Sequence, residues 1–206
     1  MKYIIYLILA AIIIIGTVGA FHLYRVSVKN KKEMSKYEGQ KIEVTKNFGK
    51  TLIVYYSNSG NTKDIAERIK AKTNADIYQI KLDEELPKGL KLHMAIRKQI
   101  KNGNYPKIKQ DIPNLIEYDI VFVGAPVWWY TVATPALSFL KQVDFANKKV
   151  VPFSTQGSNI GTYFEDFAKT IKNAELLQSA QFNNLPKKYD AEVDNKISVW
   201  LNELDI

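Results

Sequence analysis

Residues 49–206 alternate between short apolar runs and segments with helical periodicity, and this alternation constrains the fold most strongly. The run Thr51–Tyr55 is typical of a buried strand, whereas Ile65, Ala66 and Ile69 recur at the spacing of one helix face. Strands that alternate with helices indicate an α/β fold, a parallel sheet covered on both faces as a three-layer sandwich. The pattern predicts strands at Lys50–Tyr56, Ala75–Lys81, Tyr118–Gly124, Lys149–Ser154 and Leu176–Phe182, and helices at Thr62–Thr73, Leu90–Lys101, Pro135–Val143, Tyr163–Ile171 and Ala191–Leu204.

The N-terminal part of the chain has a different character. Tyr3–Tyr24 is almost entirely apolar, and about 20 such residues cross the roughly 30 Å hydrocarbon core of a bilayer as a helix. We expect a transmembrane anchor at residues 1–25, a charged linker at 26–48 and the main domain at 49–206. The anchor would contact membrane lipid through residues 3–24.

The basic residues after this apolar segment bear on its orientation. Arg25–Lys36 is rich in Lys, so the positive-inside rule predicts a single-pass protein whose main domain is cytoplasmic. The alternative is a signal peptide that is cleaved after the small residues Val18-Gly19-Ala20. In that case the domain would be secreted or extracytoplasmic.

The distribution of charge excludes several function classes. The net charge is +8, and residues 1–48 hold eight Lys/Arg against three Glu, so most of the excess lies outside the main domain. With no nucleic-acid motif, this distribution argues against a nucleic-acid partner. The chain has no Cys and no metal-ligand spacing, so we expect neither a thiolate nucleophile nor a metal site. His93 is expected to be a surface or core residue, and no catalytic residue is predicted.

The loop after the first strand is a candidate phosphate site. Ser57–Lys63 supplies hydroxyls, amides and a Gly at the start of a helix, where backbone N–H groups attract anions. An ordinary polar turn is the alternative. The sequences G-x-x-x-x-G-K-[ST] and G-x-G-x-x-G are both missing, which argues against a P-loop NTPase and a dinucleotide-binding fold.

The stretch Val54-Tyr55-Tyr56-Ser57-Asn58-Ser59-Gly60-Asn61-Thr62-Lys63 closely resembles the flavodoxin family, especially short flavodoxin-like proteins with V-Y-Y-S-x-[ST]-G-N-T-K. The resemblance implies a flavodoxin-like, five-stranded parallel sheet of order 2-1-3-4-5 and FMN as the cofactor. It further implies that the FMN phosphate is bound by the side chains of Ser57, Ser59, Asn61 and Thr62 and by the backbone of Asn58 and Gly60.

Two later loops extend the resemblance. Gly124–Tyr130 is similar to the family pattern G-x-P-[IV]-W-W, and one Trp is expected to contact the flavin while the other packs behind it. The alternative is that both Trp residues belong to the core. The polar loop after the fourth strand is less similar and could be a flexible Gly/Ser turn. The candidate cofactor residues in these two loops are Pro126, Val127, Trp128, Trp129, Thr155, Gln156, Gly157 and Ser158.

These features predict a membrane-tethered FMN protein that transfers electrons to a redox partner protein or a small acceptor. A second hypothesis is an FMN-dependent oxidoreductase that uses NAD(P)H and a quinone or another small acceptor. A third is a non-redox binding module on a flavodoxin fold, because a fold alone does not determine function.

Overall fold

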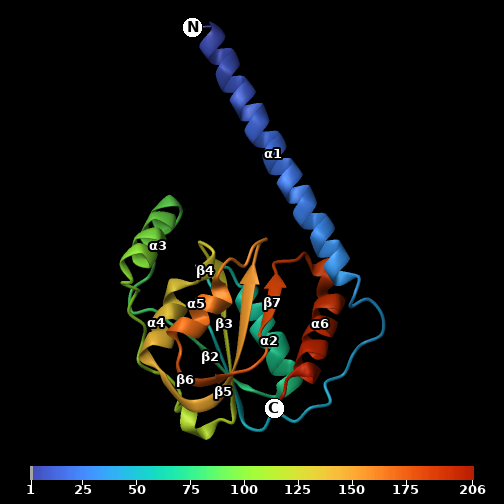
Figure 1. The fold of residues 1–206 in the computed structure, drawn as a ribbon, viewed down its shortest axis with the longest axis vertical. Helices are drawn as coiled ribbons and strands as arrows, with labels where there is room; N and C mark the ends of the chain where they lie inside the picture. Colours follow the sequence, from blue (N-terminus) through green and yellow to red (C-terminus); the bar gives the residue numbers. More distant parts are fainter. Residues whose placement is uncertain (1) are drawn as a thin grey trace.

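A parallel β-sheet forms the centre of the computed structural model, which describes residues 2–206 (Figure 1). The strands are β1 (Thr51–Tyr55), β2 (Asp76–Gln79), β3 (Ile120–Trp128), β4 (Thr131–Val132), β5 (Asp144–Gln156), β6 (Lys172–Leu176) and β7 (Ala180–Asn183). The main path is β2-β1-β3-β5-β6; β7 also pairs with β5, and β4 pairs antiparallel with β3. The predicted α/β class and the order of the first four predicted strands are confirmed.

The predicted fifth strand, Leu176–Phe182, is wrong in detail, because the chain forms two short strands there. β6 pairs with the first half of β5, and β7 pairs with the second half. Between them the indole of Trp200 donates a hydrogen bond of 2.9 Å to the carbonyl of Gln178. This carbonyl faces a helix rather than a neighbouring strand, so the edge of the sheet is interrupted.

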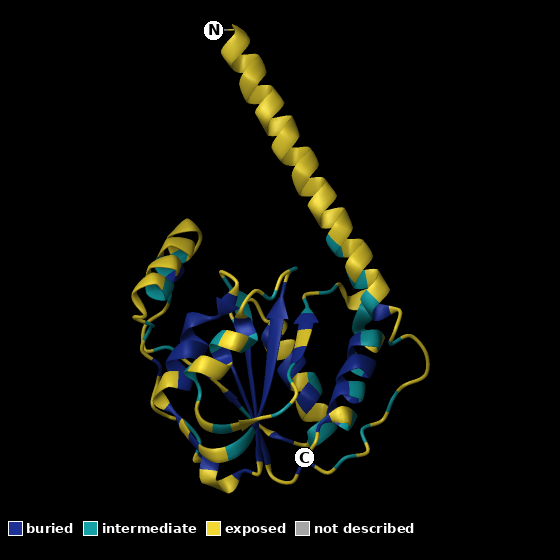
Figure 2. Cartoon of the chain, in the orientation of Figure 1, coloured by how far each residue is buried: buried dark blue, intermediate teal, exposed yellow. Residues whose placement is uncertain are grey.

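Helices cover both faces of the sheet, as predicted, and they separate its core into two clusters. Along β3, Val121 and Val123 point to one face and Phe122 to the other, following the two-residue period of a strand. The cartoon coloured by burial shows the buried strands between the helical layers (Figure 2). The domain helices are α2 (Asn61–Thr73), α3 (Leu90–Asn102), α4 (Thr134–Gln142), α5 (Tyr163–Thr170) and α6 (Asp190–Glu203).

The N-terminal helix α1 (Lys2–Met34) projects from the domain and is long and apolar enough to cross a membrane (Figure 1). It has 33 residues, which corresponds to about 50 Å at 1.5 Å per residue. The helix continues about three turns beyond Tyr24, where the apolar segment ends. The last of these turns belong to the domain, because Met34 is only 2% exposed and lies in the core.

Residues 26–48 were expected to form a charged linker, but residues 30–48 of this segment pack against the domain instead of forming a free tether. Phe48 is 4% exposed, and the buried side chain of Asn195 in α6 holds the chain between these ends. Its amide N–H donates a hydrogen bond of 2.9 Å to the carbonyl of Tyr37, and its amide oxygen accepts one of 2.9 Å from the N–H of Ile42. We call the contact of residues 30–48 with α6 and β7 the α1–α6 seam.

Charged and polar side chains fix the root of α1 in this seam. Glu33 and Lys196 form an ion pair with an N–O distance of 2.5 Å, and both side chains are largely removed from solvent. The amide of Asn183 in β7 donates 2.8 Å to the side chain of Asn30. Because these contacts come from both β7 and α6, α1 leaves the domain in a fixed direction.

Buried tyrosines with raised pKa values, Tyr56 and Tyr78 among them, make the stability of the domain sensitive to high pH. Burial raises the pKa of Tyr56 to about 12, and burial together with the neighbouring Asp111 carboxylate raises the pKa of Tyr78 to about 12. Below pH 10 both phenols are neutral in the folded and unfolded chain. Above it the unfolded chain ionises first, so we expect stability to fall by about 1.4 kcal/mol per pH unit and per group until about pH 12.

Urea unfolding at several pH values between 8 and 12 measures this effect. Tyr56→Phe and Tyr78→Phe should each flatten the loss of stability above pH 10. The same variants compared with the wild type at pH 8 are the control, because the phenols of Tyr56 and Tyr78 are neutral there in the folded and the unfolded chain. An equally steep fall in the Tyr56→Phe, Tyr78→Phe double variant would contradict the assignment.

Candidate functional site

The carboxyl ends of three neighbouring strands meet at one edge of the sheet. The parallel register places Tyr55 of β1 beside Gly124 of β3, and Gly124 beside Phe153 of β5. The loops that follow these strands therefore start at the same height. In open α/β sheets this edge, near the point where the strand order reverses, is where ligands bind.

The loop from Ser57 to Thr62 leads directly into α2. Gly60 has a φ of +94°, a conformation that L side chains rarely adopt, and its N–H donates 3.1 Å to the hydroxyl of Ser57. The first helical N–H with an acceptor is that of Asp64, which donates 2.9 Å to the carbonyl of Gly60. The preceding N–H groups of the first turn have no intrahelical partner and can bind an anion.

Two threonines join this loop to the end of β5. The hydroxyls of Thr62 and Thr155 lie 2.7 Å apart and both residues are buried. Ser59 and Asn61 also bond to each other, with the amide donating 3.1 Å to the hydroxyl. The loop is thus held by its own side chains and by β5, with its backbone left facing outward.

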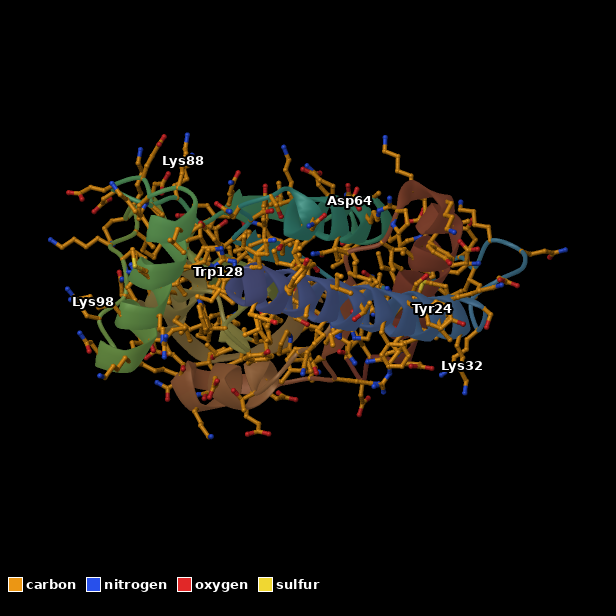
Figure 3. All side chains as sticks on the ribbon, turned by 90° about the horizontal axis from the view of Figure 1, so that it is seen from above. Tyr24, Lys32, Asp64, Lys88, Lys98 and Trp128 are labelled. Atoms are coloured by element: carbon orange, nitrogen blue, oxygen red, sulfur yellow. The ribbon has the colours of Figure 1, made fainter. Side chains whose placement is uncertain are left out.

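Beside this loop lies a cleft of about 520 Å³, which is within the usual size range of small-molecule sites. All three predicted loops and α3 contribute to its walls. Figure 3 shows Trp128 at the centre of this end of the domain. The cleft is lined by Asn58, Leu92, His93, Ile96, Val127, Trp128, Trp129, Tyr130, Gln156, Gly157, Ser158 and Asn159.

The two tryptophans of the cleft differ in their support. Trp128 is half-buried, and its ring meets Tyr56 edge to face with 5.5 Å between centroids. Trp129 is 47% exposed and, with Tyr130, forms the two-residue turn between β3 and β4. Both turn residues have positive φ, +50° and +65°, which is strained for aromatic side chains. The ring of Trp128 is thus the more buried of the two and packs on Tyr56, whereas the Trp129 ring has the guanidinium of Arg97 5.7 Å from its centre.

Comparison with known proteins gives one family and a group of similar structures. Residues 50–203 match the sequence profile of a family described as Flavodoxin. The chain belongs to the flavodoxin family. No curated protein sequence gives a match.

Two solved structures illustrate the likeness of this flavodoxin to known proteins. A flavoprotein from Lactobacillus acidophilus NCFM, crystallised in complex with FMN, is 28% identical, with a TM-score of 0.60, and covers 65% of this chain and 93% of its own. A second structure, named a putative flavoprotein from Bacteroides eggerthii DSM 20697, is 25% identical, with a TM-score of 0.62. The match covers 77% of this chain and 99% of the Bacteroides chain.

The predicted cofactor residues of this flavodoxin fall into three groups. Asn58, Val127, Trp128, Trp129, Gln156, Gly157 and Ser158 line the cleft, while Ser57, Ser59, Gly60 and Asn61 belong to the loop beside it. Thr62 and Thr155 are buried between them, and Pro126 pairs beside Thr155 in the sheet without lining the cleft. Their contacts with a cofactor stay a prediction.

One wall of the cleft was not predicted from the sequence. Leu92, His93 and Ile96 come from α3, and His93, expected as an ordinary surface or core residue, is an exposed part of this wall. The helix itself was predicted, but no motif in it indicates a ligand. Only the topology, which places the segment after β2 beside the loop after β3, identifies these residues.

The Thr62–Thr155 contact gives a direct test of this arrangement. Thr62→Val is expected to lower stability by about 1–3 kcal/mol, because it leaves the buried hydroxyl of Thr155 without its partner. The double variant Thr62→Val, Thr155→Val should recover part of that loss. Urea unfolding of the wild type, both single variants and the double variant measures the coupling. Additive losses would show that the two hydroxyls do not interact.

Proposed function

We propose that this chain is a membrane-tethered flavodoxin that transfers electrons beside the membrane. The chain is a flavodoxin-like FMN-binding protein by its family. The observation that carries the proposal is the convergence of the loops after β1, β3 and β5 on one cleft. When bound, FMN supplies the redox chemistry, and the protein supplies its position and surroundings.

The residues at the site fit the parts of FMN. The outward-facing backbone of Ser57–Thr62 and its hydroxyls suit a phosphate, and this loop directly adjoins the cleft through Asn58. The flat, largely apolar flavin ring suits the wall of Trp128, Val127 and Leu92. In the part of the chain that the structure describes, no carboxylate lines the cleft, so no adjacent negative charge opposes reduction of the ring.

The test is the spectrum of the full-length protein purified in detergent. We expect a yellow protein with bound flavin that is released on denaturation at about one FMN per chain. Apo protein that does not take up added FMN would refute the proposal. The same spectrum excludes or supports the third hypothesis, a binding module without a flavin.

A second candidate function is reduction of a small acceptor with NAD(P)H. It is favoured by a hollow of about 630 Å³ that adjoins the cleft, shares Asn58 and Leu92 with it, and extends along the loop of residues 79–89. A second small molecule could bind there beside the flavin. Steady-state oxidation of NAD(P)H with a soluble quinone separates this enzyme from an electron carrier, which would show no such turnover.

The membrane tether is the remaining part of the proposal. It is supported by the length and apolarity of α1 and by the basic residues that follow its apolar segment. We infer a single span with the flavodoxin domain in the cytoplasm. N-terminal sequencing of the mature protein tests the span, and a chain that begins at Phe21 would contradict it.

A further inference from the structure

α3 and its flanks form the most basic stretch of the main domain. Residues 86–110 contain seven Lys/Arg and no Asp or Glu. Their net charge is therefore +7, whereas that of the whole chain is +8. Ile96 points into the protein, while Leu90 and Met94 are 75% and 59% exposed. The outer surface of α3 therefore combines two exposed apolar side chains with several cations, which is typical of helices that lie in a membrane interface.

This basic helix lies at the same end of the domain as α1. Figure 1 shows α3 rising beside the carboxyl ends of the strands, on the side from which α1 projects. Seen from above, Lys88 and Lys98 lie at one edge of this end, Lys32 lies at the other, and Trp128 lies between them (Figure 3). Two basic regions thus flank the cleft.

The α1–α6 seam limits how far this end of the domain can move from a membrane. The helix is continuous through Met34, so the stretch from Arg25, the first basic residue after the apolar segment, to Met34 in the domain core has only ten residues. Ten helical residues span about 15 Å. Because Glu33 and Asn30 fix the root of α1, the domain cannot swing freely about a flexible linker.

We propose that α3 is a second membrane contact, with Leu90 and Met94 at the interface and its Lys and Arg side chains on anionic lipid headgroups. The inference rests on the proposed anchor, and it adds that the domain is held at two points with the cofactor cleft facing the bilayer. The positive charge of α3 matches the negative surface of the cytoplasmic leaflet. An electron acceptor dissolved in the membrane would then reach the cleft directly.

The absence of native Cys allows this to be tested on the full chain with single labelled cysteines. Met94→Cys reports on α3, Ile13→Cys on the anchor, and Asp205→Cys on the C-terminus, which lies at the opposite end of the domain (Figure 1). Each variant carries an environment-sensitive fluorophore and is reconstituted into vesicles of phosphatidylcholine and phosphatidylglycerol. A nitroxide attached to the lipid headgroups quenches labels at the surface.

We expect quenching at Met94→Cys to be several-fold stronger than at Asp205→Cys, and to decrease in pure phosphatidylcholine or at high salt. Adding Lys91→Gln, Lys98→Gln and Lys101→Gln should weaken it without changing the label at Ile13→Cys. An apolar emission shift of the label at Ile13→Cys without quenching at Met94→Cys would overturn the second contact and leave the anchor intact. The second membrane contact would also be overturned if the emission of the Met94→Cys label changed only when an acidic protein is added, and not with vesicles.

Loss of both signals would overturn the anchor together with the second contact. The flavin absorbance of the same vesicles is an independent reading of cofactor binding. Failure of the lipid contact is therefore distinguishable from failure of the proposed flavodoxin function.

Discussion

Replacing Trp128 by Ala is expected to weaken FMN binding by about 30- to 150-fold, which corresponds to a loss of about 2–3 kcal/mol. The ring of Trp128 is half-buried, meets Tyr56 edge to face and lines the cleft, so its position is fixed before a ligand binds. A fixed ring loses little conformational freedom on binding, and its full contact area contributes to affinity. Fluorescence titration of apo protein with FMN measures the change.

Trp129→Ala is the matched control for this prediction. Trp129 lines the same cleft, but it is exposed and lies in the strained turn between β3 and β4. We expect its removal to reduce affinity less than about fivefold, because the half-exposed Trp129 ring has less area to bury against a ligand and already contacts the Arg97 guanidinium. A larger loss for Trp129→Ala than for Trp128→Ala would reverse the assignment of the two rings.

Replacing Gly124 by Ala is expected to destabilise the domain by about 3 kcal/mol or more, at or above the upper end of the usual cost of overpacking a core. An added Cβ at this position would lie 2.0 Å from the ring of Phe153, which is fully buried in the adjacent strand. The ring cannot retreat without displacing the core below the site. Thermal or urea unfolding measures the loss.

Two further variants make this result specific. Gly157→Ala adds the same methyl group where no atom lies within 4 Å, so its effect on stability should stay within about 0.5 kcal/mol. Phe153→Leu combined with Gly124→Ala should recover part of the loss by making room. If Gly124→Ala is as stable as the wild type, the close approach of β3 and β5 at this point is incorrect.

Features that depend on local sequence were predicted well. The Ser57–Thr62 loop and the Trp128–Trp129 loop each follow an apolar strand, so their positions follow from the register of a parallel sheet. Gly60 is needed at the start of α2 because of its positive φ, and it belongs to the motif that identified the loop. In these places the residues that determine the structure are neighbours in the chain.

Features that depend on distant partners were not predicted. Residues 26–48 were expected to form a charged linker, yet Asn195 binds the backbone of this segment from a position over 150 residues away. Similarly, the indole of Trp200 interrupts the edge strand at Gln178. The sequence does not show which distant backbone groups a single polar side chain in a helix will bind.

The α1–α6 seam also has a consequence for how this protein is made. The segment that packs against α6 leaves the ribosome more than 150 residues before Asn195 and Lys196 of α6. The seam can therefore close only after all strands and helices of the domain have been synthesised. A fragment that starts at residue 49 would leave Lys196 without Glu33 and Asn195 without its backbone partners. We expect such a fragment to be less stable than the whole chain, so that residues 30–48 and the domain form one folding unit.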